Sequence, residues 1–290
     1  MNNPAPKVIL TIAGSDSGAG AGIQADLKSI HANGGYAVTA LTSVTSQNTQ
    51  RVAAAHHLPD EMIRGQIDVL FEDFAIAAAK TGMLATARIV SVVSEALRAH
   101  PVDHLVVDPV MISTSGYPLI DSEGQRAMRE FLLPLATLCT PNLPEAEALS
   151  GIRIQSLEDV ETAARAIHGL GPRAVLIKGG HGTSEEIVDT LFDGEAVHRF
   201  AHRRLETRAT HGTGCALSAA LATRLARSEG LATAVKHAQT YVARAIARGV
   251  PIGSGHSPTD LFFFQSGDWT SYGSGTYPEV TSLAGRYRSS

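Results

Sequence analysis

Short runs of Val, Ile and Leu alternate along this chain with longer segments that have the spacing of amphipathic helices. This alternation limits the fold more than any other feature, because it is typical of parallel strands joined by crossover helices. We therefore expect a three-layer α/β/α sandwich around a mostly parallel central sheet. The expected strands are residues 8–13, 37–44, 75–79, 105–107, 137–139 and 174–177.

The segments that separate these strands have helical periodicity. Within residues 61–71, for example, Met62, Ile63, Ile67 and Leu70 repeat at helical spacing. An Asp193-Gly194 turn between the apolar runs 186–192 and 196–202 instead predicts an antiparallel hairpin. The expected helices are residues 23–33, 61–71, 87–99, 122–133, 145–150, 157–170, 215–227 and 231–248.

Composition narrows the class of protein. The net charge of −4 lacks the basic excess of nucleic-acid-binding proteins, and no apolar run reaches the roughly 20 residues of a membrane helix. The first seven residues lack the layout of a secretory signal, so we expect a cytoplasmic location. The two cysteines, Cys139 and Cys215, lie too far apart in sequence for a disulfide framework or a zinc site.

A change of composition divides the chain near its end. We expect one domain over residues 1–264. From Gln265 onward the sequence is rich in Ser, Gly and Tyr and holds the only tryptophan, Trp269. Such a segment buries little core, so residues 265–290 are expected to form a loosely attached tail. A contact between subunits is the alternative role for this tail.

The stretch Thr210-His211-Gly212-Thr213-Gly214-Cys215 is a glycine-punctuated turn that opens an alanine- and leucine-rich helix. The unpaired N–H groups and the positive dipole end of a helix start favour a phosphate. Gly212 and Gly214 leave no Cβ in the way of an approaching anion. The same field predicts a lowered pKa for Cys215. The alternative is a small buried cysteine at an ordinary helix start.

A second glycine-rich loop follows the first strand and runs from Ala13 to Gly22. Its spacing fits neither the dinucleotide-binding fingerprint nor a P-loop. It is either a tight structural turn or a place where Gly14 lets a flat ligand lie against the backbone. Asp26, in the next helix, either faces that ligand or compensates the helix dipole.

Polar side chains follow several of the other strands. Gln47 offers a donor and an acceptor that suit an aminopyrimidine, although a turn is the common reading of such a site. Asp108 and Glu145 have the hard oxygens that Mg²⁺ prefers, with dipole compensation as the alternative for Glu145. Lys178, which precedes two glycines, either reaches triphosphate oxygens or is a solvated loop lysine.

Together these segments resemble the hydroxymethylpyrimidine and phosphomethylpyrimidine kinases of thiamine biosynthesis, within the ribokinase-like superfamily. The resemblance runs in order from Val8 to His256. The most specific matching stretches are Thr11-Ile12-Ala13-Gly14-Ser15-Asp16, Gly20-Ala21-Gly22-Ile23-Gln24-Ala25-Asp26-Leu27-Lys28, Lys80-Thr81-Gly82-Met83-Leu84, Thr140-Pro141-Asn142-Leu143-Pro144-Glu145-Ala146, Lys178-Gly179-Gly180-His181 and His211-Gly212-Thr213-Gly214-Cys215.

The resemblance implies a role for each matched site residue. Four of them would line the pyrimidine pocket, three would bind ATP, and three would form the catalytic anion hole. The remaining two would act on Mg²⁺. In that order the residues are Gly14, Asp26, Gln47 and Met83; Lys178, Thr210 and Thr213; Gly212, Gly214 and Cys215; Asp108 and Glu145.

The resemblance also implies the reaction. MgATP would phosphorylate 4-amino-5-hydroxymethyl-2-methylpyrimidine and then its monophosphate, with Cys215 as a thiolate that accepts or orients the hydroxyl proton. A homodimer is expected. A pyridoxal or pyridoxine kinase is the alternative enzyme, and a ligand-sensing module without catalysis is the alternative of another class.

Three residues depart from the family's usual pattern. Ala19 replaces a glycine, which is mild if φ is negative there. Ala209 stands where Asn is usual and Ala216 where Thr is frequent, so a polar contact near the nucleotide is expected to be missing.

Overall fold

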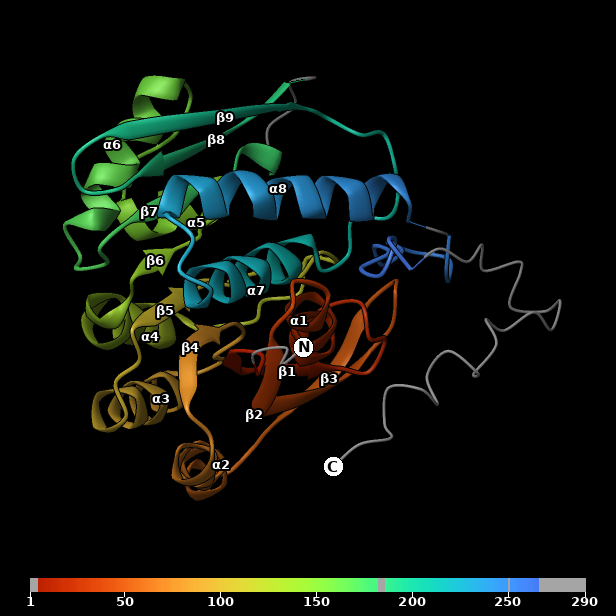
Figure 1. The fold of residues 1–290 in the computed structure, drawn as a ribbon. Helices are drawn as coiled ribbons and strands as arrows, with labels where there is room; N and C mark the ends of the chain where they lie inside the picture. Colours follow the sequence, from red (N-terminus) through yellow and green to blue (C-terminus); the bar gives the residue numbers. More distant parts are fainter. Residues whose placement is uncertain (1–4, 182–185, 250, 266–290) are drawn as a thin grey trace, which may run out of the picture.

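One nine-stranded sheet forms the centre of the computed structural model, which describes residues 5–181, 186–249 and 251–265 (Figure 1). The strand order is β3-β2-β1-β4-β5-β6-β7-β8-β9. The neighbouring strands β2, β1, β4, β5, β6 and β7 pair in parallel. Strand β3 pairs antiparallel with β2, β8 with β7, and β9 with β8. The strands are β1 Val8–Asp16, β2 Tyr36–Gln47, β3 Val52–His57, β4 Ile76–Thr81, β5 His104–Val107, β6 Leu138–Cys139, β7 Val175–Ile177, β8 Glu186–Phe192 and β9 Val197–Arg203.

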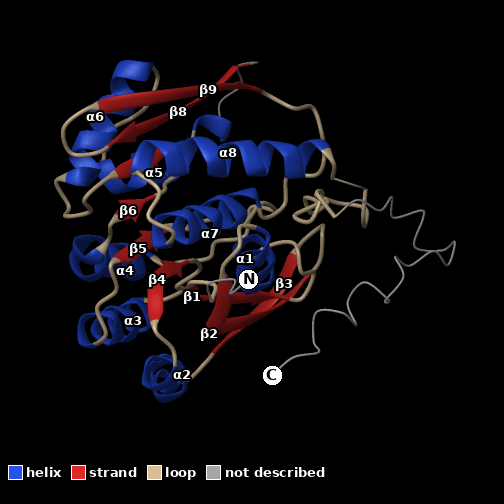
Figure 2. Cartoon of the chain, viewed as in Figure 1, coloured by secondary structure: helices blue, strands red, loops and turns tan. Residues whose placement is uncertain are grey.

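Helices cover both faces of this sheet, so the predicted three-layer sandwich is confirmed (Figure 2). One face carries α1 (Gly22–Ala32), α7 (Thr213–Ala226) and α8 (Leu231–Ala247). The helices of the other face are α2 Asp60–Asp73, α3 Ala87–Ala99, α4 Ser122–Ala127, α5 Leu143–Ser150 and α6 Leu157–His168.

The core consists of two apolar layers, one on each side of the sheet. Neighbouring strand residues point to opposite faces, so fully buried Ile9 packs with the α7 layer and fully buried Leu10 with the α3 layer. Helix α7 is alanine-rich and buried on nearly all sides, so it lies close against the sheet. This packing fixes the position of its N-terminus.

The structure departs from the sequence-based expectation in two elements. Residues 122–133 were expected to form one helix. The segment instead begins as α4, which ends at Ala127, and continues through a π-helical turn, Met128–Leu132, into a 3-10 turn, Leu133–Leu135. Pro134 in that last turn has no N–H to donate, which disfavours a regular α-helical end. Strand β3 was not expected, because its Ala- and His-rich sequence has low strand propensity.

The predicted hairpin is confirmed, since β8 and β9 pair antiparallel around Asp193. The predicted tail, 265–290, lies outside the described residues apart from Gln265, so the domain boundary stays a prediction. Among the helices of the described part of the chain, none has the length and apolar content needed to span a bilayer.

Candidate functional site

A cavity of about 910 Å³ lies at the carboxyl edge of the parallel strands, beside the first turn of α7. Because parallel strands end at the same edge of a sheet, residues that follow them in sequence meet there. All the predicted site residues except Asp26 line this cavity: Gly14, Gln47, Met83, Asp108, Glu145, Lys178, Thr210, Gly212, Thr213, Gly214 and Cys215.

The N-terminus of α7 opens directly into the cavity. Gly212 is its N-cap and has a φ of +80°, and a Cβ there would lie 1.8 Å from the carbonyl oxygen of Gly20. Only glycine fits this position. Gly212 provides no side-chain cap, and the first N–H groups of a helix have no intrahelical acceptor. The amides of Gly214 and Cys215 are therefore placed to bind an anion.

The thiol of Cys215 does not have the lowered pKa that the sequence predicted. Burial raises its pKa to about 11, although the Lys80 ammonium and the amide of Gly22 oppose that rise. At neutral pH the free protein therefore holds a thiol rather than a thiolate. The cause is the enclosed position of the sulfur, which outweighs the favourable field of the helix end.

Gly14 and Met83 form one wall at the β1–β4 side of the cavity. A Cβ at Gly14 would lie 3.1 Å from Sδ of Met83, so glycine allows the thioether to lie against the backbone. Gln47 lies nearby at the end of β2. Its Oε1 accepts a hydrogen bond from Oγ1 of Thr45 at 3.1 Å, and this bond orients the amide.

The prediction that Asp26 lines the cavity is wrong for this structure. Its side chain is fully buried, and Nζ of Lys80 lies 2.8 and 2.9 Å from its two carboxylate oxygens. Oγ1 of Thr11 donates a further bond at 2.6 Å. Helix α1 turns Asp26 toward β4, so the carboxylate neutralises a buried lysine behind the cavity wall.

Lys178 forms an ion pair with Asp108, with 2.9 Å between Nζ and Oδ1. Its side chain is 13% exposed, so it is not a solvated loop lysine. Burial would lower the pKa of Lys178, but Asp108 and Glu145 together raise it, so the ammonium stays charged.

Glu145 has two functions in the local structure. It forms a capping box with Asn142 at the start of α5, in which Oε2 accepts from the Asn142 amide at 2.8 Å. Burial raises the pKa of this carboxyl to about 7, although Lys178 opposes the rise. The position at a helix start that the sequence offered as the alternative for Glu145 is therefore observed, and its carboxylate also lines the cavity, while its role toward Mg²⁺ stays a prediction.

The family of the chain follows from comparison with known proteins. The family model for phosphomethylpyrimidine kinase matches residues 16–260. The chain belongs to this family.

Individual relatives agree with that membership. A hydroxymethylpyrimidine/phosphomethylpyrimidine kinase of Streptomyces coelicolor is 45% identical over 88% of this chain and 94% of that protein. A thiamine biosynthesis bifunctional protein of Geobacter sulfurreducens is 44% identical over 87% of this chain but only 51% of its own length. The chain thus spans about half the length of the bifunctional relatives that it matches.

Solved structures support the same fold. A pyridoxal kinase from Staphylococcus aureus, in complex with AMP-PCP and pyridoxal, has a TM-score of 0.83 and 34% sequence identity. The match covers 90% of this chain and 96% of that one. The ribokinase-like fold predicted from the sequence is therefore confirmed.

The three departures from the family pattern have different surroundings. Ala19 has a φ of +59°, so the condition under which this change would be mild is not met. Its amide donates to the Asp16 carbonyl at 2.9 Å in a tight turn that suits glycine. Ala209 and Ala216 are buried and do not line the cavity.

Two residues missed by the sequence analysis, Asp16 and His211, lie in the wall of the cavity. His211 Nε2 lies 2.9 Å from Oδ2 of Asp16, although 195 positions separate them in the chain. The signal available in the sequence for Asp16 was an acid followed by glycines near the end of the first strand.

A third missed group lies at the opposite end of the cavity. Asp189 accepts hydrogen bonds from the amide of Gly179 at 2.7 Å and from Nε2 of Gln239 at 2.6 Å. His202 is 3.9 Å from the same carboxylate, which raises the pKa of the imidazole. This carboxylate holds the turn that follows Lys178 against α8.

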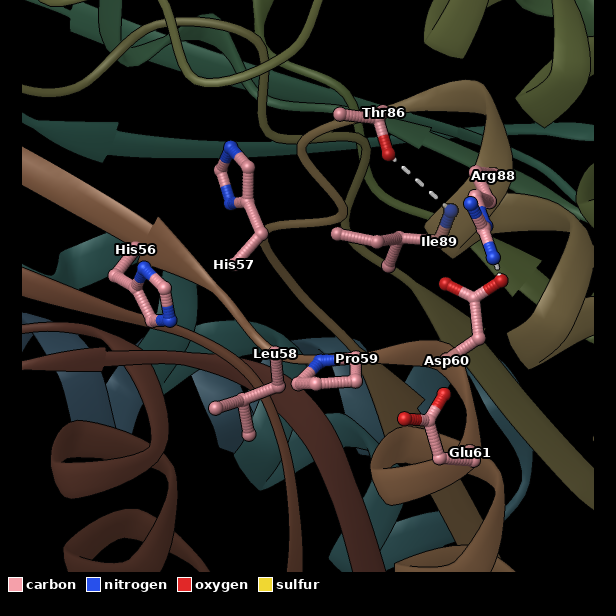
Figure 3. A pocket seen from close by; sticks show the side chains of 9 residues that line it. All are labelled: His56, His57, Leu58, Pro59, Asp60, Glu61, Thr86, Arg88 and Ile89. Carbon is pink, nitrogen blue, oxygen red and sulfur yellow. Dashed lines mark hydrogen bonds and ion pairs between the residues drawn. The ribbon is translucent and has the colours of Figure 1, made fainter.

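A second hollow, of about 390 Å³, lies between the end of β3 and the starts of α2 and α3 (Figure 3). Arg88 points toward Asp60 and forms an ion pair with it, so the Asp60 carboxylate compensates the charge of the guanidinium. His56 and His57 stand on the opposite side. The residues predicted from the sequence to carry chemistry all lie elsewhere, so we assign the function to the larger cavity.

Proposed function

We propose that this protein transfers the terminal phosphoryl group of ATP to the 5-hydroxymethyl group of 4-amino-5-hydroxymethyl-2-methylpyrimidine, and then to the resulting monophosphate. These are two steps of thiamine biosynthesis. The relatives named for both activities share 40–45% identity with the chain, which supports the proposal.

One observation carries the proposal. The free amides at the start of α7 face a single cavity that Gln47 and Lys178 also line, and the strand order separates these two residues, because Gln47 ends β2 and Lys178 follows β7. An anion bound at Gly212, Gly214 and Cys215 would thus lie between an aromatic-binding end and a cationic end. Phosphoryl transfer requires this order of acceptor, travelling phosphoryl group and nucleotide.

The acceptor end suits an aminopyrimidine. The Gln47 amide can donate to a ring nitrogen and accept from an exocyclic amine. Met83 would pack on the ring, since its thioether is apolar and polarisable. Gly14 leaves room for the ring at the backbone. Asp26 is not part of this contact, because Lys80 and Thr11 already occupy its carboxylate.

The nucleotide end combines Lys178, Thr210 and Thr213, which would bind ATP phosphates, with the apolar side chains of Val242 and Ile246. Within the described residues, no group of three or more His, Cys, Asp or Glu side chains could hold a metal ion alone. Two carboxylates, Asp108 and Glu145, nevertheless line the cavity and suit Mg²⁺ that keeps several waters and binds phosphates. When bound, Mg²⁺ would neutralise charge on the phosphate oxygens.

The test is a coupled assay of ADP release with ATP and three acceptors in parallel: the pyrimidine alcohol, its monophosphate and pyridoxal. We expect turnover with the first two, with the monophosphate and diphosphate identified by mass spectrometry. Absence of ADP release with all three would favour the ligand-sensing module instead.

Pyridoxal kinase is the second candidate, because the chain matches a pyridoxal kinase structure over 90% of its length. Pyridoxal is also a flat heteroaromatic ring with a hydroxymethyl group, so it suits the same wall of Gly14 and Met83. A higher kcat/KM for pyridoxal than for the pyrimidine alcohol would reverse the order of the two candidates.

The homodimer and the cytoplasmic location stay parts of this proposal. Support for a dimer comes from β3, which closes one edge of the sheet with exposed Ala53 and Ala54. Size-exclusion chromatography with light scattering tests it. The free thiols of Cys139 and Cys215 agree with a reducing compartment.

A further inference from the structure

The proposed reaction with the pyrimidine alcohol needs a group that takes the hydroxyl proton. The Cys215 thiol is a poor acceptor, because its pKa of about 11 keeps the sulfur protonated at neutral pH. The wall of the cavity contains an imidazole beside the start of α7, and its geometry suits that role better.

The Asp16 carboxylate fixes the orientation of that imidazole. Its Oδ1 accepts from the amide of Gly18 at 2.8 Å, and its Oδ2 accepts from the amides of Gly20 and Ala21 at 3.1 and 2.9 Å. Burial alone would raise the pKa of Asp16, but the bonds from His211 and from the amides of Ala21 and Gly18 lower it overall. The carboxylate is thus ionised and can only accept, so Nε2 of His211 carries the hydrogen of their 2.9 Å bond.

The second ring nitrogen of His211 is therefore left as an acceptor when the ring is neutral. Nδ1 lies 3.5 Å from Oγ1 of Thr114, which belongs to the segment that lines the cavity across from α7. The His211 side chain is only 8% exposed and directly precedes the Gly212 N-cap. A carboxylate, an oriented imidazole and an anion-binding helix start thus adjoin one another.

Among the described residues, Nδ1 has only the long 3.5 Å contact with the Thr114 hydroxyl, which a substrate hydroxyl can replace, and the Gln47 side chain approaches the other ring nitrogen. Nε2 of Gln47 lies 3.5 Å from Nε2 of His211, and both atoms carry hydrogens. The NH₂ group of Gln47 is therefore not satisfied by the ring and stays free to donate to a ligand, while its Oε1 accepts from Thr45. A Cβ at Gly20 would lie 2.2 Å from Cδ2 of His211, so the glycine loop holds the imidazole closely in this orientation.

We propose that His211, oriented by Asp16, is the catalytic base for phosphorylation of the alcohol. This inference rests on the proposed function. The hydroxyl proton moves to Nδ1, and the alcohol oxygen forms its bond to the γ-phosphorus of ATP. The bond from that phosphorus to the β–γ bridging oxygen breaks, and its electron pair leaves with ADP. Asp16 stabilises the imidazolium, which then loses its proton to water.

The role is confined to the first of the two reactions. The acceptor of the second reaction is a phosphate oxygen, and a phosphate monoester has a second pKa near ~6, so above neutral pH it is already an anion. No base is needed for that acceptor. A residue that merely supports the fold of the cavity would affect both reactions alike, whereas a base affects only the alcohol.

The experiment compares kcat for both acceptors in the wild type and in His211→Gln at pH 8 with saturating MgATP. The glutamine amide can still donate to Asp16 but cannot take a proton. We expect kcat with the alcohol to fall by about 10²–10⁴-fold. We expect kcat with the monophosphate to stay within the order of magnitude of the wild type, which also demonstrates that the variant is folded. His211→Asn is the second variant should the first fail to fold.

Two further variants complete the comparison. His56→Gln, on the exposed edge strand outside the cavity, is the matched control and should change neither reaction. An equal loss in both reactions of His211→Gln, or no loss in either, overturns the inference. The inference is also overturned if Cys215→Ala lowers kcat with the alcohol alone and His211→Gln does not. A wild type that is inactive with both acceptors contradicts the proposed function itself, and this result is obtained before any variant is compared.

Discussion

Nζ of Lys80 lies within hydrogen-bond distance of both carboxylate oxygens of Asp26, at 2.8 and 2.9 Å, and both side chains are fully buried. The pair joins α1 to β4. Burial would lower the pKa of Lys80, but the carboxylate charges of Asp26 and Asp108 outweigh burial and raise it, so the ammonium is charged at neutral pH.

Removing one partner of this pair should destabilise the protein rather than weaken substrate binding selectively. Asp26→Asn leaves a buried ammonium without its counter-charge, which typically costs about 3–5 kcal/mol. We expect the free energy of unfolding, measured in urea, to fall by that amount. The double variant Asp26→Asn/Lys80→Met removes both charges and should recover part of the loss. A stable Asp26→Asn protein with a raised KM for the pyrimidine would instead restore Asp26 to the pocket.

The Cys215 thiol should react slowly with iodoacetamide. With a pKa of about 11, the thiolate fraction near pH 7.5 is lower by about 10²-fold than for an ordinary cysteine. Because limited access also slows alkylation, the informative quantity is the pH dependence of the rate. We expect the rate at Cys215, followed by peptide mapping, to keep rising up to pH 10. A plateau below pH 8 would mean that the thiolate predicted from the sequence is present after all.

The buried carboxyl of Glu145 should make stability depend on pH near neutrality. Its pKa is raised from 4.5 to about 7 by burial, so the folded state holds a proton that the unfolded state has lost. This contribution is complete below pH 4.5 and disappears as the pH rises through 7.

Glu145→Gln tests this dependence, since glutamine stays neutral and can still accept from the Asn142 amide in the capping box. Between pH 6 and pH 8, the unfolding free energy of the variant should rise relative to the wild type by about 1 kcal/mol. Urea unfolding at the two pH values measures the change. A difference that does not depend on pH would mean that Glu145 is ionised throughout this range.

Much of the fold was predictable because local sequence patterns determine its strands and helices. Buried parallel strands are continuous apolar runs, and their crossover helices have helical periodicity, so the layer order followed from residues such as Ile9 and Val93. The missing strand β3 has no such pattern. Its Ala and His residues are held by pairing with β2, as in Val44 opposite His56, and such pairing is a tertiary effect.

The same distinction between local pattern and tertiary packing applies to the residues of the site. Residues such as Asp108 and Lys178 directly follow parallel strands, so the topology alone brought them to one edge. Asp26 was misplaced because its partner Lys80 lies 54 positions away, and only the packing of α1 on the sheet brings them together. The pKa of Cys215 was misjudged because a helix end is visible in the sequence, whereas the burial of its sulfur is not.

The last prediction concerns Ala19, the only site departure with a strained backbone. An L-residue in the left-handed region costs roughly 1–2 kcal/mol, part of which glycine offsets through its larger unfolded-state entropy. Ala19→Gly should therefore raise the free energy of unfolding by up to about 1 kcal/mol.

Ser228 has a similar φ of +64° but is exposed at the end of α7, so Ser228→Gly is the matched control. Both variants should gain stability in urea unfolding. Of the two variants, only Ala19→Gly can also change turnover, because its turn begins at Asp16, which holds His211. A loss of stability in Ala19→Gly would mean that the methyl group of Ala19 makes contacts that outweigh the strain.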